Sequence, residues 1–143
     1  SSAASDVYKR QGEEAKRRIL LGTFVLSAGY FDRYYLLAQK ARTKIIQDFT
    51  HVFKRVNLLL APTSPTTAIK IGEWKKYPFF GEKQDILVEA SALAGLPGIN
   101  INAGFSRQHL PIGIQIFGPQ KQENLILSLA YRLEKELEKK DEA

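Results

Sequence analysis

Hydrophobic residues recur at the three- and four-residue steps of an α-helix in two stretches near the start of the chain. The first stretch, residues 13–30, places Ile19, Leu20 and Phe24 on one face. The second stretch covers residues 32–54 and keeps the same spacing. The pattern therefore predicts two long helices that are neighbours in space and are joined by a tight corner.

Strand patterns follow. Residues 56–61 form a short apolar run that Pro62 ends, which is typical of a buried strand. Residues 98–103 and 111–117 alternate apolar and polar side chains, and the short connection between them predicts an antiparallel hairpin. A strand followed by a loop with hydroxyl side chains is a common place for ligand contacts in α/β proteins.

Two further helices complete the prediction. Residues 85–94 are apolar and rich in alanine and are followed by Gly95, and residues 123–140 carry an apolar stripe on one face. Residues 70–83 look irregular. This order of helices and strands indicates an α/β layered fold, but three strands are too few for a well-covered sheet. We therefore expect an incomplete sheet that belongs to a larger domain.

The first residues of the chain lack the periodicity of either a helix or a strand, and they join abruptly to the first patterned helix. We interpret residues 1–11 as a non-native or disordered tail, and we expect the natural part of this sequence to begin near Gly12, with the natural residues upstream of it lost. Residues 12–143 then form the folded part.

Composition narrows the possible functions. The chain has 143 residues, of which 44% are hydrophobic and 25% charged, values that are ordinary for a soluble globular domain. It has no cysteine, which excludes disulfides, thiolate metal sites and cysteine nucleophiles. The net charge of +6 is compatible with a nucleic-acid partner, but the basic residues are spread along the helices. No apolar run is long enough to span a bilayer, and we expect a cytoplasmic protein without a membrane partner.

Three sequence blocks resemble the amidase-signature family. The first is KRRILLGTFVLSAGYFDRYY followed by AQKAR, the second is LLAPTSPTTA, and the third combines ALAGLPG, GF and LPIGIQIFG. The first block is similar to the A subunits of the glutamyl-tRNA(Gln)/aspartyl-tRNA(Asn) amidotransferases, whereas the other two are found across the wider family. The resemblance implies the C-terminal portion of the amidase-signature fold, a mixed β-sheet flanked by helices.

The resemblance also implies a reaction. Enzymes of this family hydrolyse amides with a Ser–cis-Ser–Lys triad and stabilise the oxyanion with backbone N–H groups. In the A subunits the amide is that of glutamine, and the ammonia passes to a B subunit that uses ATP and Mg²⁺ to convert glutamyl-tRNA(Gln). The triad lies upstream of the segment that this chain resembles. We therefore assign no catalytic residue, no metal ligand and no cofactor to this chain, and we expect the isolated chain to be an inactive fragment.

Two substrate-binding residues follow from the same resemblance. Arg18 falls where the A subunits have the arginine that pairs with the α-carboxylate of glutamine, a task suited to the planar guanidinium. Asp85 falls where they have the aspartate that receives the α-ammonium group. The sequence alone, without the resemblance, favours an ordinary solvated helix residue at Arg18 and an N-cap of the following helix at Asp85, and the N-cap and ligand roles of Asp85 are not exclusive.

Other polar residues carry weaker signals. We interpret the hydroxyl residues of the loop after the first strand as turn formers rather than as pocket residues. His51 and His109 have no partner at catalytic or metal-ligand spacing, and we expect both at the surface. The tyrosines at positions 30, 34 and 35 are expected to pack between helices.

Three functions remain open at this point. The first is the A subunit of the amidotransferase, with glutamine as substrate, B and C subunits as partners and tRNA contacted through the complex. The second is a stand-alone amidase of the same family that acts on another amide. The third is a small non-catalytic helical module that binds RNA. An upstream reading frame that encodes the Ser–Ser–Lys triad would eliminate the third.

Overall fold

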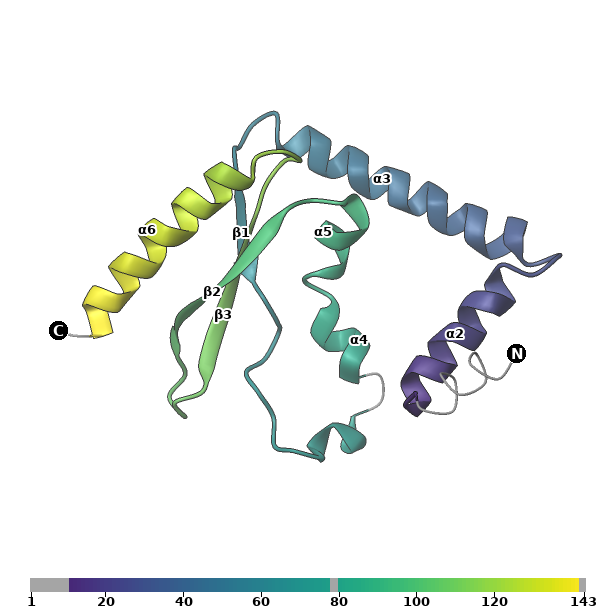
Figure 1. Ribbon diagram of the computed structural model, residues 1–143, viewed down its shortest axis with the longest axis horizontal. Helices are drawn as coiled ribbons and strands as arrows, with labels where there is room; N and C mark the ends of the chain where they lie inside the picture. The colour runs from purple at the N-terminus through teal and green to yellow at the C-terminus, as the bar shows by residue number, and fades with distance from the viewer. Residues whose placement is uncertain (1–10, 78–79, 142–143) are drawn as a thin grey trace. The chain divides into compact units, whose positions relative to one another are not determined.

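The computed structural model describes residues 11–77 and 80–141, and the chain divides into two compact units, residues 1–43 and 44–143 (Figure 1). The predicted tail, residues 1–11, lies outside the described residues except for Gln11. Among the residues that are described, no helix is both long and apolar enough to cross a membrane.

The first unit contains the first predicted helix and the start of the second, and the first helix is shorter than the periodicity suggested. Helix α2 covers Glu13–Val25, a π-helical turn η1 covers Phe31–Tyr35, and α3, Leu36–Val52, begins in this unit. The predicted helix over residues 13–30 ends at Val25, and Gly29, four residues further on, adopts a φ of 83° that a continuing α-helix does not allow. The hydroxyl of Ser27 also donates to the carbonyl of Phe24.

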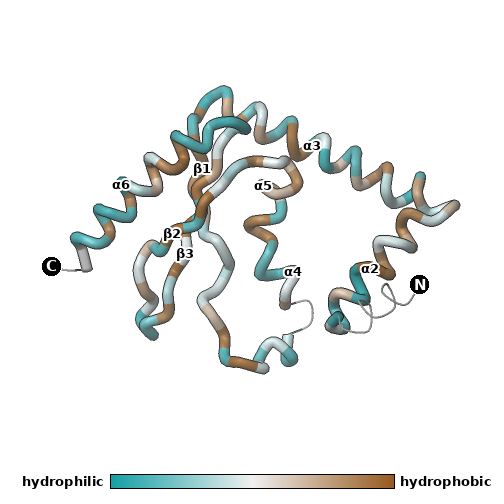
Figure 2. Tube along the Cα trace, viewed as in Figure 1, coloured by the Kyte–Doolittle hydropathy of each residue, from teal (hydrophilic) through white to brown (hydrophobic). Residues whose placement is uncertain are grey.

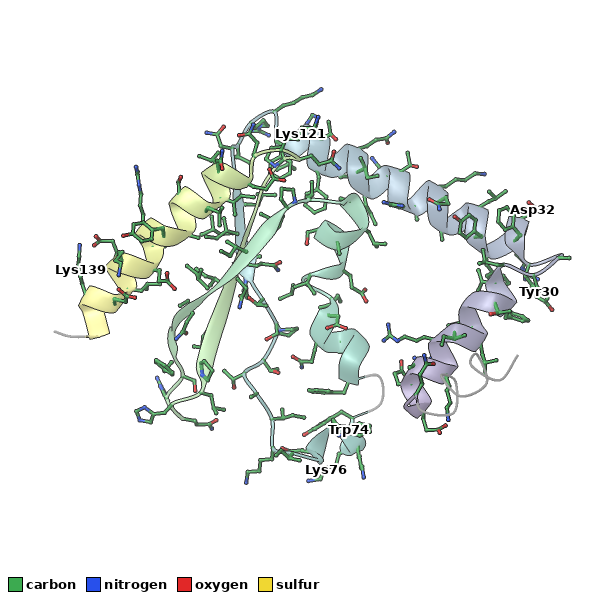
Figure 3. The ribbon with its side chains drawn as sticks, in the orientation of Figure 1. Tyr30, Asp32, Trp74, Lys76, Lys121 and Lys139 are labelled. Carbon is green, nitrogen blue, oxygen red and sulfur yellow. The ribbon has the colours of Figure 1, made fainter. Side chains whose placement is uncertain are left out.

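Aromatic rings pack at the corner between α2 and η1. The ring of Tyr30 lies 4.2 Å from that of Phe24 and 6.0 Å from that of Tyr34, and the rings of Phe31 and Tyr35 stack at 4.7 Å. Figure 3 shows Tyr30 and Asp32 at this corner. The contacts agree with the packing role predicted for the tyrosines, since such pairs stabilise a corner beyond the apolar area that they bury.

The second unit is built on a three-stranded sheet of order β1-β3-β2, with β1 at Leu59–Pro62, β2 at Gly98–Phe105 and β3 at Pro111–Phe117. Both pairings are antiparallel, so the predicted hairpin is confirmed. A mixed sheet was expected for the complete family fold. Among the described residues, the strands of this sheet pair only in the antiparallel sense. Strand β1 begins later than the apolar run over residues 56–61.

Helix α6, Glu123–Asp141, covers one face of the sheet, as its apolar stripe predicted. Its residues Ile126 and Ala130 join Ile101 and Ile116 in the buried core, and Ile116 has no exposed surface. Figure 2 shows hydrophobic and hydrophilic residues alternating along this helix, and Figure 3 shows Lys121 at the turn before it and Lys139 near its end. Burial of this aliphatic layer is the main stabilising term of the unit.

The other face of the sheet is approached by short helices (Figure 1). The segment 70–83 is not irregular throughout, since it holds a 3₁₀ helix η2, Glu73–Lys76, and most of α4, Phe80–Asp85. Figure 3 shows Trp74 and Lys76 on η2. The single helix predicted over residues 85–94 was also wrong, because α5 covers only Glu89–Ala94. Gly95 ends α5 at a φ of 68°, as expected for a C-terminal glycine.

Candidate substrate-binding site

Two neighbouring polar side chains, those of Gln115 and Asn100, lie on the face of the sheet away from α6. Gln115 of β3 pairs in register with Ala61 of β1 and with Asn100 of β2. Since successive side chains of a strand point to opposite faces, this pair lies opposite the aliphatic layer that contains Ile116 and Ile101. One face of the sheet therefore packs into the aliphatic core, and the other carries Gln115 and Asn100 together with the buried ring of Phe117.

Gln115 is the buried member of this pair, with 7% of its surface exposed. Its Nε2 donates to the backbone carbonyl of Pro62 at 3.0 Å and to that of Leu87 at 2.8 Å. Both partners are acceptors, so the amide nitrogen must face them. The sequence patterns did not identify Gln115 as a functional residue; the available signal was a single polar side chain between Ile114 and Ile116 of β3.

The loop after β1, residues 63–67, carries four hydroxyl side chains, and we call it the hydroxyl loop. The hydroxyl of Thr63 bonds the side-chain oxygen of Asn100, and the backbone N–H of Thr63 donates to the carbonyl of Gly113 at 3.0 Å. Ser64 donates to the carbonyl of Thr66 at 2.7 Å, which is a local turn contact. The turn-forming role predicted for this loop is therefore confirmed at Ser64, whereas Thr63 connects the loop to the sheet.

Glycine at position 113 makes this contact possible. A Cβ atom there would lie 2.9 Å from both the Thr63 hydroxyl oxygen and the Asn100 side-chain oxygen. Real Cβ atoms essentially never approach so closely, so any larger residue would push the loop from the sheet. The close approach of backbone and side chains, rather than an unusual φ, is what requires glycine here.

Asp85 is the last residue of α4 and is exposed. It is not an N-cap of α5, since that position belongs to Val88, so this alternative is wrong. Its backbone carbonyl accepts from the N–H of Val88 at 2.9 Å, and the neighbouring Gln84 donates from Nε2 to the hydroxyl of Thr66 at 3.0 Å. Asp85 therefore lies beside the hydroxyl loop. We call Thr63, Thr66, Gln84, Asn100 and Gln115 the polar cluster.

Arg18 lies on α2 in the first unit, with 60% of its side chain exposed. Its Nε donates to Glu14 Oε1 at 2.7 Å, and Arg17 bonds both oxygens of the same carboxylate at 2.8 Å. The hydrogen bonds from Arg17, and then from Arg18, lower the pKa of Glu14 from 4.5 to about 2. This pair of guanidinium groups thus binds a carboxylate within its own helix.

Arg18 and Asp85 belong to different units of the chain, so their convergence on one ligand stays a prediction.

His51 and His109 are exposed, as expected. Within residues 11–77 and 80–141 no group of three His, Asp or Glu side chains has the spacing to hold a metal ion.

A separate open groove of about 350 Å³ lies in the second unit. Its lining is mainly apolar and includes Phe49, Phe53 and Leu96. The ring of Phe49 also meets that of Phe117 edge to face at 5.8 Å. None of the residues of the polar cluster lines this groove, so the two features are distinct.

Comparisons with known proteins show which proteins this sequence resembles. The sequence is 48% identical over 133 residues to the A subunit of the glutamyl-tRNA(Gln) amidotransferase of Nostoc sp., and 49% identical over 129 residues to that of Halothermothrix orenii. Each alignment covers 90% of this chain, and the chain spans 27% of the length of these relatives.

Solved structures agree on the fold. The A subunit of the glutamyl-tRNA(Gln) amidotransferase of Thermotoga maritima matches with a TM-score of 0.59 and 43% identity, over 82% of this chain and 26% of that one. The allophanate hydrolase of Kluyveromyces lactis matches with a TM-score of 0.68 and 24% identity, over 91% of this chain and 21% of that one, a likeness of fold alone. The sequence profile of the Amidase family matches residues 4–127, and the chain therefore belongs to the Amidase family.

Proposed function

We propose that this chain is part of the glutamine-hydrolysing A subunit of a glutamyl-tRNA(Gln) amidotransferase. The observation that carries the proposal is identity of 48% to a protein of that name across 90% of the chain. Because the chain spans 27% of that relative, the activity belongs to the complete protein, in which the Ser–cis-Ser–Lys triad is expected to break the amide bond.

The role proposed for this chain is to hold the two charged ends of glutamine. The guanidinium of Arg18 pairs with the α-carboxylate, and the carboxylate of Asp85 receives the α-ammonium group. Two observations on the described residues support this role: 60% of the Arg18 side chain is exposed, and Asp85 is exposed beside the hydroxyl loop. Binding of the α-carboxylate and the α-ammonium group would direct the side-chain amide of glutamine toward the nucleophile.

The partners follow from the same proposal. The complete A subunit works in the cytoplasm with B and C subunits, and the B subunit uses ATP and Mg²⁺ to transfer the released ammonia to glutamate on tRNA. Contact with tRNA is indirect and runs through the complex. Aspartyl-tRNA(Asn) is the other acceptor compatible with the resemblance.

A stand-alone amidase is the second candidate, and one experiment separates the two. The complete protein is expressed with and without its B and C subunits, and ammonia release from glutamine is measured. We expect turnover of glutamine that depends on the partner subunits and is lost on replacement of the triad serines. Turnover of an aryl or aliphatic amide without the partners, and none with glutamine, would contradict the proposal.

The 143-residue chain alone provides a second check on the assignment of the triad. We expect no hydrolysis of glutamine or of any other amide by this polypeptide. Turnover that a serine-directed reagent abolishes would show that a catalytic serine lies within the chain.

A further inference from the structure

A buried amide joins the hydroxyl loop to the segment that carries Asp85. Gln115 donates one N–H bond to Pro62, the last residue of β1, and the other to Leu87, two residues after Asp85. Gln115 therefore connects, from a single side chain, the start of the hydroxyl loop with the link between α4 and α5. A side chain that is 7% exposed makes these bonds away from competing water.

Asp85 is held from both sides by this arrangement. On its N-terminal side Gln84 bonds Thr66 at 3.0 Å, a contact between exposed side chains. On its C-terminal side the carbonyl of Leu87 is held at 2.8 Å by Gln115, while the carbonyl of Asp85 itself accepts from Val88. Exposed hydrogen bonds contribute little to a fixed geometry, so the buried bond from Gln115 is the stronger restraint on this segment.

We propose that Gln115 is a positioning residue for substrate binding, which sets the place of Asp85 by holding the carbonyl of Leu87 against the end of β1. The inference rests on the proposed function, since it takes Asp85 as the group that receives the α-ammonium of glutamine. Gln115 itself does not touch the reacting atoms in this proposal.

Loss of the Gln115 side chain should change substrate preference, which a general loss of stability does not do. If Asp85 moves, the enzyme loses affinity for the α-ammonium group while other contacts to the substrate persist. Small displacements of an orienting group reduce turnover by large factors. The ratio of kcat/KM for glutamine to kcat/KM for 4-carbamoylbutanoate, which lacks the α-amino group, should therefore fall. A variant that is merely less stable lowers both values together and leaves the ratio unchanged.

The experiment uses the complete protein in its amidotransferase complex and measures ammonia release from the two substrates. Asp85→Asn should remove most of the preference for glutamine. Gln115→Met keeps a similar volume but donates no hydrogen bond, and it should lower the ratio on the order of tenfold. The matched control is Gln120→Met, because Gln120 donates only to the carbonyl of Gly95 from an exposed position, and its ratio should equal that of the unmodified protein.

If Gln115→Met does not fold, Gln115→His retains one N–H donor and should give a smaller decrease in the ratio. An unchanged ratio in either folded variant, with Asp85→Asn still abolishing the preference, would overturn the role of Gln115 and leave the proposed function intact. A preference that survives Asp85→Asn would also overturn the inference. An unmodified protein that does not turn over glutamine would instead refute the proposed function.

Discussion

Replacement of Gly113 by alanine is a direct test of how the hydroxyl loop is attached to the sheet. The new Cβ would lie 2.9 Å from the side-chain oxygens of Thr63 and Asn100 and 3.2 Å from the Cβ of Thr63. The amide of Asn100 is able to turn away, but Thr63 is held because its N–H donates to the carbonyl of Gly113 at 3.0 Å. The hydrogen bond between Thr63 and Asn100 must therefore open.

The expected cost is the sum of three effects. Loss of the hydrogen bond costs about 0.5–1.5 kcal/mol. Crowding in a packed site costs about 1–3 kcal/mol. The lower conformational entropy of the unfolded alanine chain offsets about 0.4–1 kcal/mol of this. We therefore expect Gly113→Ala to lower the free energy of unfolding by about 2 kcal/mol.

Urea unfolding followed by circular dichroism measures this loss, and a double-mutant cycle identifies its cause. Thr63→Ala removes one of the two obstructing oxygens, so Gly113→Ala should cost about 1 kcal/mol less in that background. If the two substitutions add to within about 0.5 kcal/mol, the close approach to Thr63 is not the cause of the lost stability.

Three further predictions concern the first unit and α5. In the complete enzyme, Arg18→Ala should raise KM for glutamine roughly 10- to 100-fold, because a charged hydrogen bond to the α-carboxylate is lost. Arg17→Ala is the matched control and should leave KM for glutamine unchanged. An unchanged KM for Arg18→Ala would remove Arg18 from the substrate-binding site. The pKa of Glu14 is lowered to about 2, so the bonds of Glu14 to the two arginines stabilise α2 fully above pH about 4.5. This stabilisation should be lost as the pH falls toward 2. An NMR titration of the Glu14 carboxyl carbon with a midpoint near pH 4.5 would contradict the prediction. Gly22→Ala in α2 should stabilise the protein by about 0.5–1 kcal/mol, because the new Cβ meets nothing within 4 Å. Gly95→Ala should destabilise the protein by about 1–2 kcal/mol, because Gly95 has a φ of 68°. Urea unfolding measures both changes.

Local sequence patterns predicted the elements whose residues interact mainly with their chain neighbours or along one long face. The hairpin of β2 and β3, and α6 with its apolar stripe, have nearly the predicted bounds. The family was also evident from the sequence, because its blocks are contiguous. The boundary of α2 was less accurate, since the helical periodicity continues to residue 30 whereas α2 ends at Val25.

Around Asp85 the sequence was a poorer guide. The predicted helix over residues 85–94 is in fact α4, a link and α5, because the carbonyl of Leu87 bonds to Gln115 across the unit instead of continuing a helical ladder. Tertiary contacts override the propensity of short, apolar segments in this way. No local signal identifies which distant side chain provides such a bond.

The sequence by itself determined the type of most elements, the family, and the residue types suited to holding an amino acid, since these depend on spacing and side-chain chemistry along the chain. The tertiary structure alone decided that Gln115 connects the hydroxyl loop to the link after Asp85, and why position 113 must be glycine. The physical reason is that buried hydrogen bonds and close packing join residues far apart in sequence, and their energies depend on three-dimensional distances that no local pattern encodes.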